Sequence, residues 1–210
     1  MEIKIFISEI YKGKTLGRIL FNLEVQRACK DVSRKTLDLA GGNIPSYLRF
    51  LPEGINLISS DIKNSSKFID INKPLPFSDE EFYNIFFFNA LYIAEDPQRL
   101  LLEVNRVLAR DGKLFISSPF LVAEMPEPHD YARYTAEKIE SMLRIANFKS
   151  LKIRRVGGRF SASVNLLHDF LFFKIIRLIA YSLAVWLDGV TDRFQSNHPA
   201  PILYFVEATK

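Results

Sequence analysis

The stretch TLDLAGGNIPSYL, residues 36–48, is the part of the sequence that decides the fold. In this stretch, a short apolar run around Asp38 leads directly into Ala40, Gly41 and Gly42. Because glycine has no side chain, a pair of glycines lets the backbone turn sharply and approach a ligand closely. The pattern therefore predicts a buried strand that turns beside a bound molecule and continues as a short helix.

Short apolar runs alternate with segments of helical period along the rest of the chain. The apolar runs predict strands at 36–40, 55–60, within 82–91, and at 113–120, 149–156 and 201–209. The helical periods predict helices at 15–30, 45–51 and 97–110 and after Thr135, with Asp96 and Thr135 as typical N-caps. Such alternation predicts an α/β fold, a doubly wound parallel sheet with helices on both faces.

Composition and charge limit the classes of function. The 210 residues are 48% hydrophobic and 25% charged, which is typical of one globular domain. The net charge of +4 is spread thinly, and its densest cluster, at Lys152, Arg154 and Arg155, fits a strand. A nucleic-acid-binding protein normally has a larger basic stripe, so no nucleic-acid partner is predicted. The single cysteine, Cys29, and the lack of a signal-peptide pattern predict a cytoplasmic protein.

The carboxyl ends of the predicted strands meet at one edge, where open α/β sheets bind their ligands. Asp61 ends the second predicted strand, about 20 residues after Gly42, and a carboxylate there can accept hydrogen bonds from both ribose hydroxyls. This spacing predicts a cofactor that contains adenosine. The glycines fit neither the dinucleotide pattern G-x-G-x-x-G nor the P-loop pattern. The alternative is that Gly41 and Gly42 form only a tight turn and that Asp61 only caps a helix.

With these segments in view, the sequence resembles the class I S-adenosylmethionine-dependent methyltransferases, especially their small-molecule branch. TLDLAGG resembles the glycine motif of the family, LISSDI its ribose-binding acid and IDINKPLPF the stretch near the adenine. The most specific matches are long and ungapped, DPQRLLLEVNRVLARDGKLFISSPF and HDYARYTAEKIESMLRIANF. The resemblance, which spans about residues 34–156, implies a Rossmann-like, mostly parallel sheet. It also implies an antiparallel last strand, a helical insertion before that strand, and S-adenosylmethionine as cofactor.

The resemblance also implies roles for residues at the strand ends. Asp38 and Gly42 would frame the methionine end of the cofactor, and residues 61–62 would bind the ribose and lie beside the adenine. Residues 70–71 would lie near the adenine amino group and residues 89–90 beside the sulfonium. The cofactor-binding residues implied in this way are Asp38, Ala40, Gly41, Gly42, Asp61, Ile62, Asp70, Ile71, Asn89 and Ala90.

Several positions depart from the family pattern. Ala40 replaces the first glycine, which is a small change, and Ile44 stands where the third glycine is expected. A β-branched residue adopts a positive φ only with difficulty, so Ile44 predicts a cofactor loop of altered shape. Tyr83 stands in place of a common aspartate, and Tyr92 with Ile93 in place of a common acid–histidine pair.

Methyl transfer is an in-line displacement from a sulfonium, so proximity and alignment supply much of the acceleration. A general base is needed only if the acceptor must lose a proton. In residues 126–135, His129 is the candidate catalytic base, and Tyr131, Arg133 and Tyr134 are candidate substrate-binding residues. The alternative is that His129 only anchors its loop and that Arg133 forms a structural salt bridge, which we favour slightly for Arg133.

Residues 165–187, NLLHDFLFFKIIRLIAYSLAVWL, are unusually apolar. His168, Asp169, Lys174 and Arg177 interrupt them, so a transmembrane helix is not predicted. The segment is predicted to be a helical insertion that covers the active site or pairs two chains in a homodimer. A second use is peripheral contact with a membrane surface, to which the phenylalanines and the tryptophan are suited.

The whole chain, 1–210, is predicted to form a single methyltransferase-like domain. Its parts are an N-terminal helical segment (1–33), the cofactor-binding core (34–156), the helical insertion or cap (157–200) and the last strand (201–210). The predicted function is transfer of a methyl group from S-adenosylmethionine to a small molecule, for example a sugar or a lipid-linked intermediate, without a metal ion. The alternative is a non-catalytic binding or scaffold protein that keeps the fold with an impaired cofactor loop.

Overall fold

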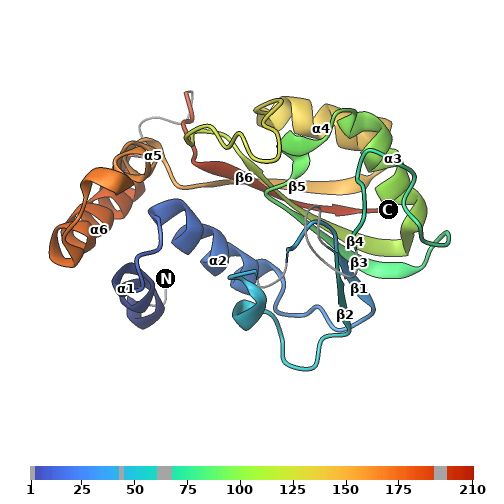
Figure 1. Cartoon of the computed structure of the whole chain (residues 1–210), viewed down its shortest axis with the longest axis horizontal. Coiled ribbons are helices and arrows are strands. Elements are labelled where there is room, and N and C mark those ends of the chain that lie inside the picture. The colour runs from blue at the N-terminus through green and yellow to red at the C-terminus, as the bar shows by residue number, and fades with distance from the viewer. Residues whose placement is uncertain (1–2, 43–44, 61–67, 192–197) are drawn as a thin grey trace.

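A computed structural model describes residues 3–42, 45–60, 68–191 and 198–210. Within these residues, six strands form one sheet in the order β2-β1-β3-β4-β6-β5 (Figure 1). The strands are β1 Thr36–Asp38, β2 Leu57–Ser59, β3 Phe82–Phe88, β4 Leu108–Pro119, β5 Lys149–Val156 and β6 Leu203–Thr209. β6 pairs antiparallel with β4 and β5, whereas β1, β2, β3 and β4 pair parallel. The predicted mostly parallel sheet with an antiparallel last strand is confirmed.

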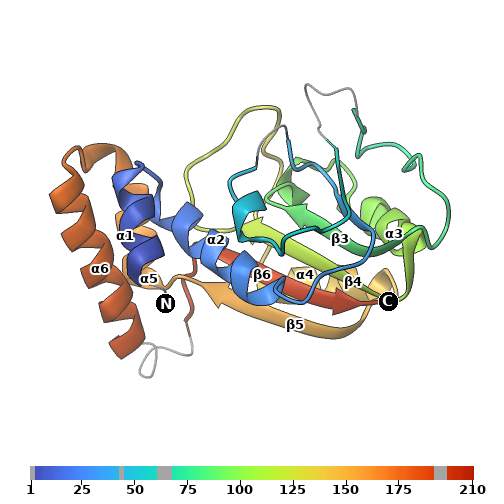
Figure 2. The same cartoon turned by 90° about the horizontal axis from the view of Figure 1, so that it is seen from below.

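Helices cover both faces of this sheet, with α3 and α4 on one face and α2 on the other (Figures 1 and 2). The helices are α1 Ile3–Tyr11, α2 Leu16–Ala28, α3 Pro97–Val107, α4 Ala136–Ile145, α5 Arg159–Leu166 and α6 Lys174–Thr191. Three short 3-10 turns are η1 Leu48–Phe50, η2 Leu91–Ile93 and η3 His168–Phe170. The predicted caps are confirmed, because Asp96 and Thr135 accept the N–H groups of Arg99 and Lys138.

β3 is the central strand and contributes to the core on both faces. Ile85 and Phe87 belong to the cluster packed under α3 and α4, and Phe86 and Phe88 belong to the cluster packed over α2. The Phe88 ring lies 5.3 Å from the ring of Phe21 in α2, edge to face. Burial on both faces explains why this strand is a continuous apolar run instead of an alternating one.

α1, α5 and α6 form a separate layer at one end of the molecule (Figure 1). A small core joins this layer to the first turns of α2, and it includes Phe6 and Ile10 of α1 and Tyr181 of α6. The Tyr181 hydroxyl lies 2.6 Å from Nδ1 of His168, which fixes η3 against α6. The helical insertion predicted before the last strand is therefore confirmed.

Two predicted helices are shorter than expected. The helix predicted at 45–51 is only the turn η1, because Leu51 is already extended (φ −82°, ψ 157°) before Pro52, and a residue before proline disfavours the helical conformation. The helix predicted to end at Arg110 ends at Val107. From Leu108 onward the chain is extended and pairs with Phe82 at the start of β3.

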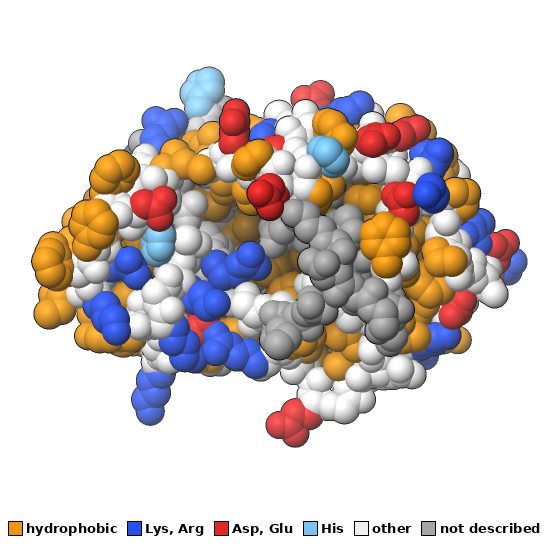
Figure 3. All heavy atoms as spheres, viewed as in Figure 1, with side chains coloured by type: hydrophobic (Ala, Val, Ile, Leu, Met, Phe, Trp, Pro, Cys, Tyr) orange, Lys and Arg blue, Asp and Glu red, His pale blue; other side chains and the backbone are white. Residues whose placement is uncertain are grey.

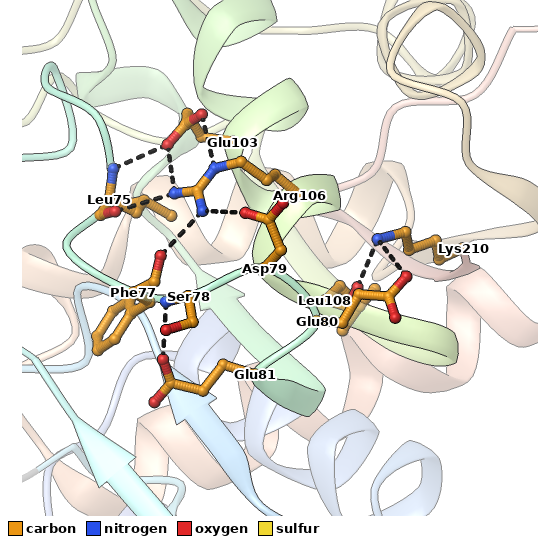
Figure 4. Close-up of polar contacts among 10 residues, drawn as sticks. All are labelled: Leu75, Phe77, Ser78, Asp79, Glu80, Glu81, Glu103, Arg106, Leu108 and Lys210. Atoms are coloured by element: carbon orange, nitrogen blue, oxygen red, sulfur yellow. Dashed lines mark hydrogen bonds and ion pairs between the residues drawn. The ribbon is translucent and has the colours of Figure 1, made fainter.

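Arg106 of α3 fastens the segment before β3 to the helix (Figure 4). Its guanidinium donates to the carbonyls of Leu75 (3.0 Å) and Phe77 (2.9 Å) and to the carboxylates of Asp79 (2.7 Å) and Glu103 (2.9 Å). Glu103 in turn accepts the N–H of Leu75 at 3.0 Å. Glu103 and Arg106 lie in one of the two segments that resemble the methyltransferase family most closely, and their role here is structural.

We expect Arg106→Ala to lower the free energy of unfolding by about 2 kcal/mol, because it leaves Glu103 and two backbone carbonyls without their donor. Urea unfolding of the purified protein measures this loss. Arg110→Ala is the matched control, because the Arg110 side chain is 87% exposed in its pair with Glu80. The control should change stability by less than about 0.5 kcal/mol. An equal loss in both variants would contradict the structural role of Arg106.

Candidate functional site

The turn after β1 is held by the end of the neighbouring strand. Ser60, directly after β2, donates its N–H to the carbonyl of Asp38 at 2.9 Å. It accepts the N–H of Ala40 at its hydroxyl (3.1 Å) and the N–H of Gly42 at its carbonyl (3.3 Å). Ala40 and Gly42 have positive φ values of 68° and 77°. The backbone of residues 40–42 therefore has a fixed shape at the carboxyl edge of the sheet.

Asp38 lies beneath this turn and shapes it from below. Its side chain is fully buried, and the Tyr47 hydroxyl donates to its carboxylate, 2.7 and 2.8 Å from the two oxygens. A Cβ added to Gly41 would lie 2.0 Å from Oδ2 of Asp38, so only glycine fits above the carboxylate. Burial raises the pKa of Asp38 to about 7, against the opposing effect of hydrogen bonds from Tyr47 and Ser59. This burial favours a role for Asp38 in shaping the turn over direct contact with a ligand.

The end of β3 lies at the same edge, next to the turn. Asn89 has a positive φ of 51°, and its side-chain oxygen accepts a hydrogen bond from the Ser117 hydroxyl at 3.0 Å. Its N–H donates to the carbonyl of Ser117 at 2.9 Å, and Ala90 beside it is buried. Because β1 pairs directly with β3, the structure brings residues 89–90 and the glycine turn together, as predicted.

A hollow opens in the middle of the face seen in Figure 3, beside α2. Arg18 of α2 is exposed, yet the surrounding protein lowers the pKa of its guanidinium, and Tyr47 and Tyr92 lie near enough to act on its charge. One turn further on, Asn22 accepts a hydrogen bond from Ser46 at 3.3 Å. Its amide nitrogen is buried without a hydrogen-bond partner in the described part of the chain.

The predicted ribose-binding residues cannot be placed. Asp61 and Ile62 lie outside the described residues, and so do Asn43 and Ile44 of the turn. Their roles in cofactor binding stay predictions.

Comparisons with known proteins agree with this geometry. Residues 37–116 match the family model described as a methyltransferase domain, and no curated protein matches the sequence. A methyltransferase dependent on S-adenosylmethionine from Archaeoglobus fulgidus is similar in structure, with a TM-score of 0.57 and 17% identity, over 92% of this chain and 94% of that chain. This chain has the class I methyltransferase fold.

Two further solved structures show how broadly this methyltransferase fold is shared. The cyclase SpnF is 16% identical, with a TM-score of 0.58, over 91% of this chain and 80% of that chain. Phosphoethanolamine N-methyltransferase 2 of Haemonchus contortus, in complex with phosphomonomethylethanolamine and S-adenosylhomocysteine, is 15% identical, with a TM-score of 0.58. The match covers 90% of this chain but only 52% of that one. Identities this low show the fold alone.

Ala40 stands where the resemblance to the methyltransferases places the first glycine of their motif. The substitution is less neutral than its size indicates, because Ala40 keeps the positive φ that favours glycine. This conformation costs a non-glycine residue about 1 kcal/mol. The methyltransferase turn is therefore kept here at the expense of backbone strain.

Asp70 and Ile71, which the methyltransferase pattern places near the adenine, form a tight turn. Asp70 accepts the N–H of Asn72 at 3.0 Å and lies 3.1 Å from the ammonium of Lys73. These two contacts hold the pKa of Asp70 below its usual value, so its carboxylate stays ionised. The side chain of Ile71 is buried in the core. Adenine contact by either residue stays a prediction.

The candidate acceptor-binding loop is held together by Asp130. Its carboxylate binds the guanidinium of Arg133 through both oxygens and accepts the N–H of Met125 at 2.9 Å. Arg133 also lies over the ring of Tyr92, 5.2 Å from its centre. Tyr92, which replaces a common acid, thus supports this loop, and the structure favours the structural role of Arg133 over substrate binding.

His129 and Tyr131 lie on the outer side of the same loop. Both side chains are exposed, and their rings are stacked with centres 5.2 Å apart. Tyr134 is half-buried, and desolvation raises the pKa of its hydroxyl. A catalytic role for His129 and substrate contacts for Tyr131 and Tyr134 stay predictions.

A cavity of about 810 Å³ lies between β5, α5 and α6 and is lined by Arg155, Gly158, Asp188 and Tyr204. β5 is four strands from β1 in the sheet, which at about 4.8 Å per strand is roughly 19 Å. A methyl acceptor in this cavity would be too far from a cofactor above the β1 turn. A cofactor above the β1 turn would therefore lie outside this cavity.

Proposed function

We propose that this protein binds S-adenosylmethionine and transfers its methyl group to a small molecule. The observation that carries the proposal is the turn of residues 40–42, which the side chain of Asp38 and the backbone and hydroxyl of Ser60 hold at the carboxyl end of β1. The fold supports the proposal, since similar structures include methyltransferases in complex with S-adenosylmethionine or S-adenosylhomocysteine.

The residues present fit such a cofactor. The backbone of Gly42 leaves room for a ligand, since an added Cβ there meets no other atom of the described residues within 4 Å. The guanidinium of Arg18 suits the carboxylate of an amino-acid group, and the Asn22 amide, which has no partner among the described residues, lies one helical turn further on. Asp61 and residues 70–71 would bind the adenosine, and residues 89–90 would lie beside the sulfonium.

The reaction needs little chemistry from the protein. When bound, the cofactor supplies an activated methyl group, and the protein aligns the acceptor and excludes water. His129 would take a proton only from an acceptor that must lose one. We propose an acceptor of the sugar or lipid-linked class, because the helical layer of α1, α5 and α6 exposes much apolar surface.

The alternative is a non-catalytic member of the fold with an impaired cofactor loop. The strained Ala40 and the isoleucine in place of the third glycine support it. The similar structure of the cyclase SpnF illustrates that chains of this fold are not all described as methyltransferases.

Calorimetry with S-adenosylmethionine and S-adenosylhomocysteine tests the proposal. We expect micromolar binding of both, and loss of binding in Asp61→Ala, because one carboxylate would hold both ribose hydroxyls. Asp79→Ala is a suitable control, since Asp79 contacts Arg106 away from the turn. No heat at high ligand concentration would favour the scaffold alternative, and unchanged binding in Asp61→Ala would contradict the role of that residue.

A further inference from the structure

The end of the molecule formed by α1, α6 and the segment between α5 and α6 is covered by exposed apolar side chains. We call it the apolar end surface, and Ile3, Ile7, Phe172, Ile175, Ile179 and Trp186 are representative of it. Figure 3 shows hydrophobic side chains projecting at this end, with basic side chains beside them. Contiguous patches of this kind are rare on monomeric proteins unless they bind something.

α6 is apolar on two opposite faces. Tyr181 and Ala184 are buried against α1 and α2, as expected for the inner face of a surface helix. Its outer face carries Ile179, Leu183 and Trp186, all exposed, where a solvent-facing helix normally carries charges. Folding of this chain therefore leaves half of the apolar surface of α6 uncovered.

The segment before α6 adds three exposed aromatic rings. Phe172 and Phe173 are 77% and 71% exposed, and Phe170 is exposed to a similar extent. The only tryptophan of the chain, Trp186, is 62% exposed on the same surface. Phenylalanine and tryptophan are the side chains that enter the boundary between lipid headgroups and acyl chains most favourably.

The charges beside this surface are mostly positive. Lys4 and Lys174 are exposed, and the Lys174 ammonium lies 6.0 Å from the ring of Tyr11, which places it between α1 and α6. The described residues of α1, η3 and α6 include three acids. Of these, Glu9 is buried and Asp188 is half-buried and accepts backbone N–H groups of α5, so only Asp169 is exposed.

We propose that the apolar end surface binds the surface of a membrane that contains anionic lipid, with α6 lying in its plane. An anionic leaflet matches both the apolar side chains and the lysines around them. In a twofold dimer through the same surface, the lysines of both chains would lie at one interface, where their like charges oppose association. None of the described helices is long and apolar enough to cross a bilayer.

The inference goes beyond methyl transfer and does not depend on it. Homodimer formation, which the apolar segment also predicts, stays a prediction, and it is the competing use of this surface. The two uses can be told apart by measurement. A dimer through this surface forms in the absence of lipid, whereas a protein that uses this surface for membrane binding is a monomer until lipid is added.

Vesicle sedimentation with tryptophan fluorescence tests the proposal. The protein is mixed with vesicles of phosphatidylcholine alone or with added phosphatidylglycerol, at low and high salt. We expect sedimentation with the anionic vesicles at low salt, weakening at high salt. We also expect the emission of Trp186 to shift to the blue as it enters the interface. Binding without a change in Trp186 emission would overturn the assignment to this surface.

The double variant Phe172→Ser/Phe173→Ser should lower vesicle affinity about tenfold or more, and Lys174→Glu about fivefold or more. Ile145→Ser is the matched control, since Ile145 is also an exposed apolar residue and lies on α4, outside this surface. Light scattering and circular dichroism verify mass and folding. No sedimentation of the folded wild type, or a lipid-independent dimer that the double variant dissociates, would overturn the proposal.

Discussion

Gly41→Ala is expected to destroy the cofactor turn and to destabilise the protein by about 3 kcal/mol. An added Cβ would lie 2.0, 2.4 and 2.7 Å from three atoms of the Asp38 side chain. Asp38 cannot move aside, because it is fully buried and bound by Tyr47. The turn must therefore shift, and we expect affinity for S-adenosylmethionine to fall at least tenfold. Urea unfolding and calorimetry measure the two losses.

Gly54→Ala is the control for backbone strain alone. Gly54 has a positive φ (74°), which Gly41 does not, and an added Cβ there meets no other atom of the described residues within 4 Å. The control should lose only about 1 kcal/mol and keep its cofactor affinity. Adding Asp38→Ala to Gly41→Ala removes the atoms in the way, so the two substitutions should be strongly non-additive. Equal losses from Gly41→Ala and Gly54→Ala would show that crowding against Asp38 is unimportant.

The sequence predicts the elements whose signals are local. β5 coincides with the predicted 149–156, and α3 and α4 begin after the capping residues Asp96 and Thr135. The short helix at 45–51 fails because the extended conformation imposed on Leu51 by Pro52 outweighs a weak helical pattern.

The site was predicted in outline but not in its contacts. The turn at 40–42 follows β1 and Asn89 follows β3. Because these two strands pair parallel, their carboxyl ends lie side by side at one edge of the sheet, as the predicted fold class requires. Tyr47 was missed, since only the tertiary structure brings its hydroxyl to Asp38, and a single tyrosine carries no motif. Its position a few residues after the glycine turn is the only sequence signal that marks it.

We expect the second large effect to be a loss of stability between pH 5 and pH 8 that is caused by Asp38. Its folded pKa of about 7 lies well above the usual value of about 3.9. At a pH between these two pKa values, Asp38 is deprotonated in the unfolded chain and protonated in the folded protein. The free energy of unfolding therefore falls as the pH rises. The full loss, reached above pH 7, is at most about 4 kcal/mol.

Asp38→Asn should remove this loss, since an amide has the same shape, accepts the hydrogen bond of Tyr47 and does not ionise. We expect the variant to gain stability relative to the wild type at pH 8 and to gain much less at pH 5, in urea unfolding at both values.

Asp130→Asn is the control, because the pKa of Asp130 is shifted in the opposite direction to that of Asp38. Arg133 holds the pKa of Asp130 below its usual value, so this carboxylate is ionised in both states over this range. Its substitution should therefore cost the same at pH 5 and pH 8. If the effect of Asp38→Asn on stability is also the same at pH 5 and pH 8, the Asp38 carboxylate is ionised over this whole pH range. The protein would then hold a buried negative charge under its cofactor turn.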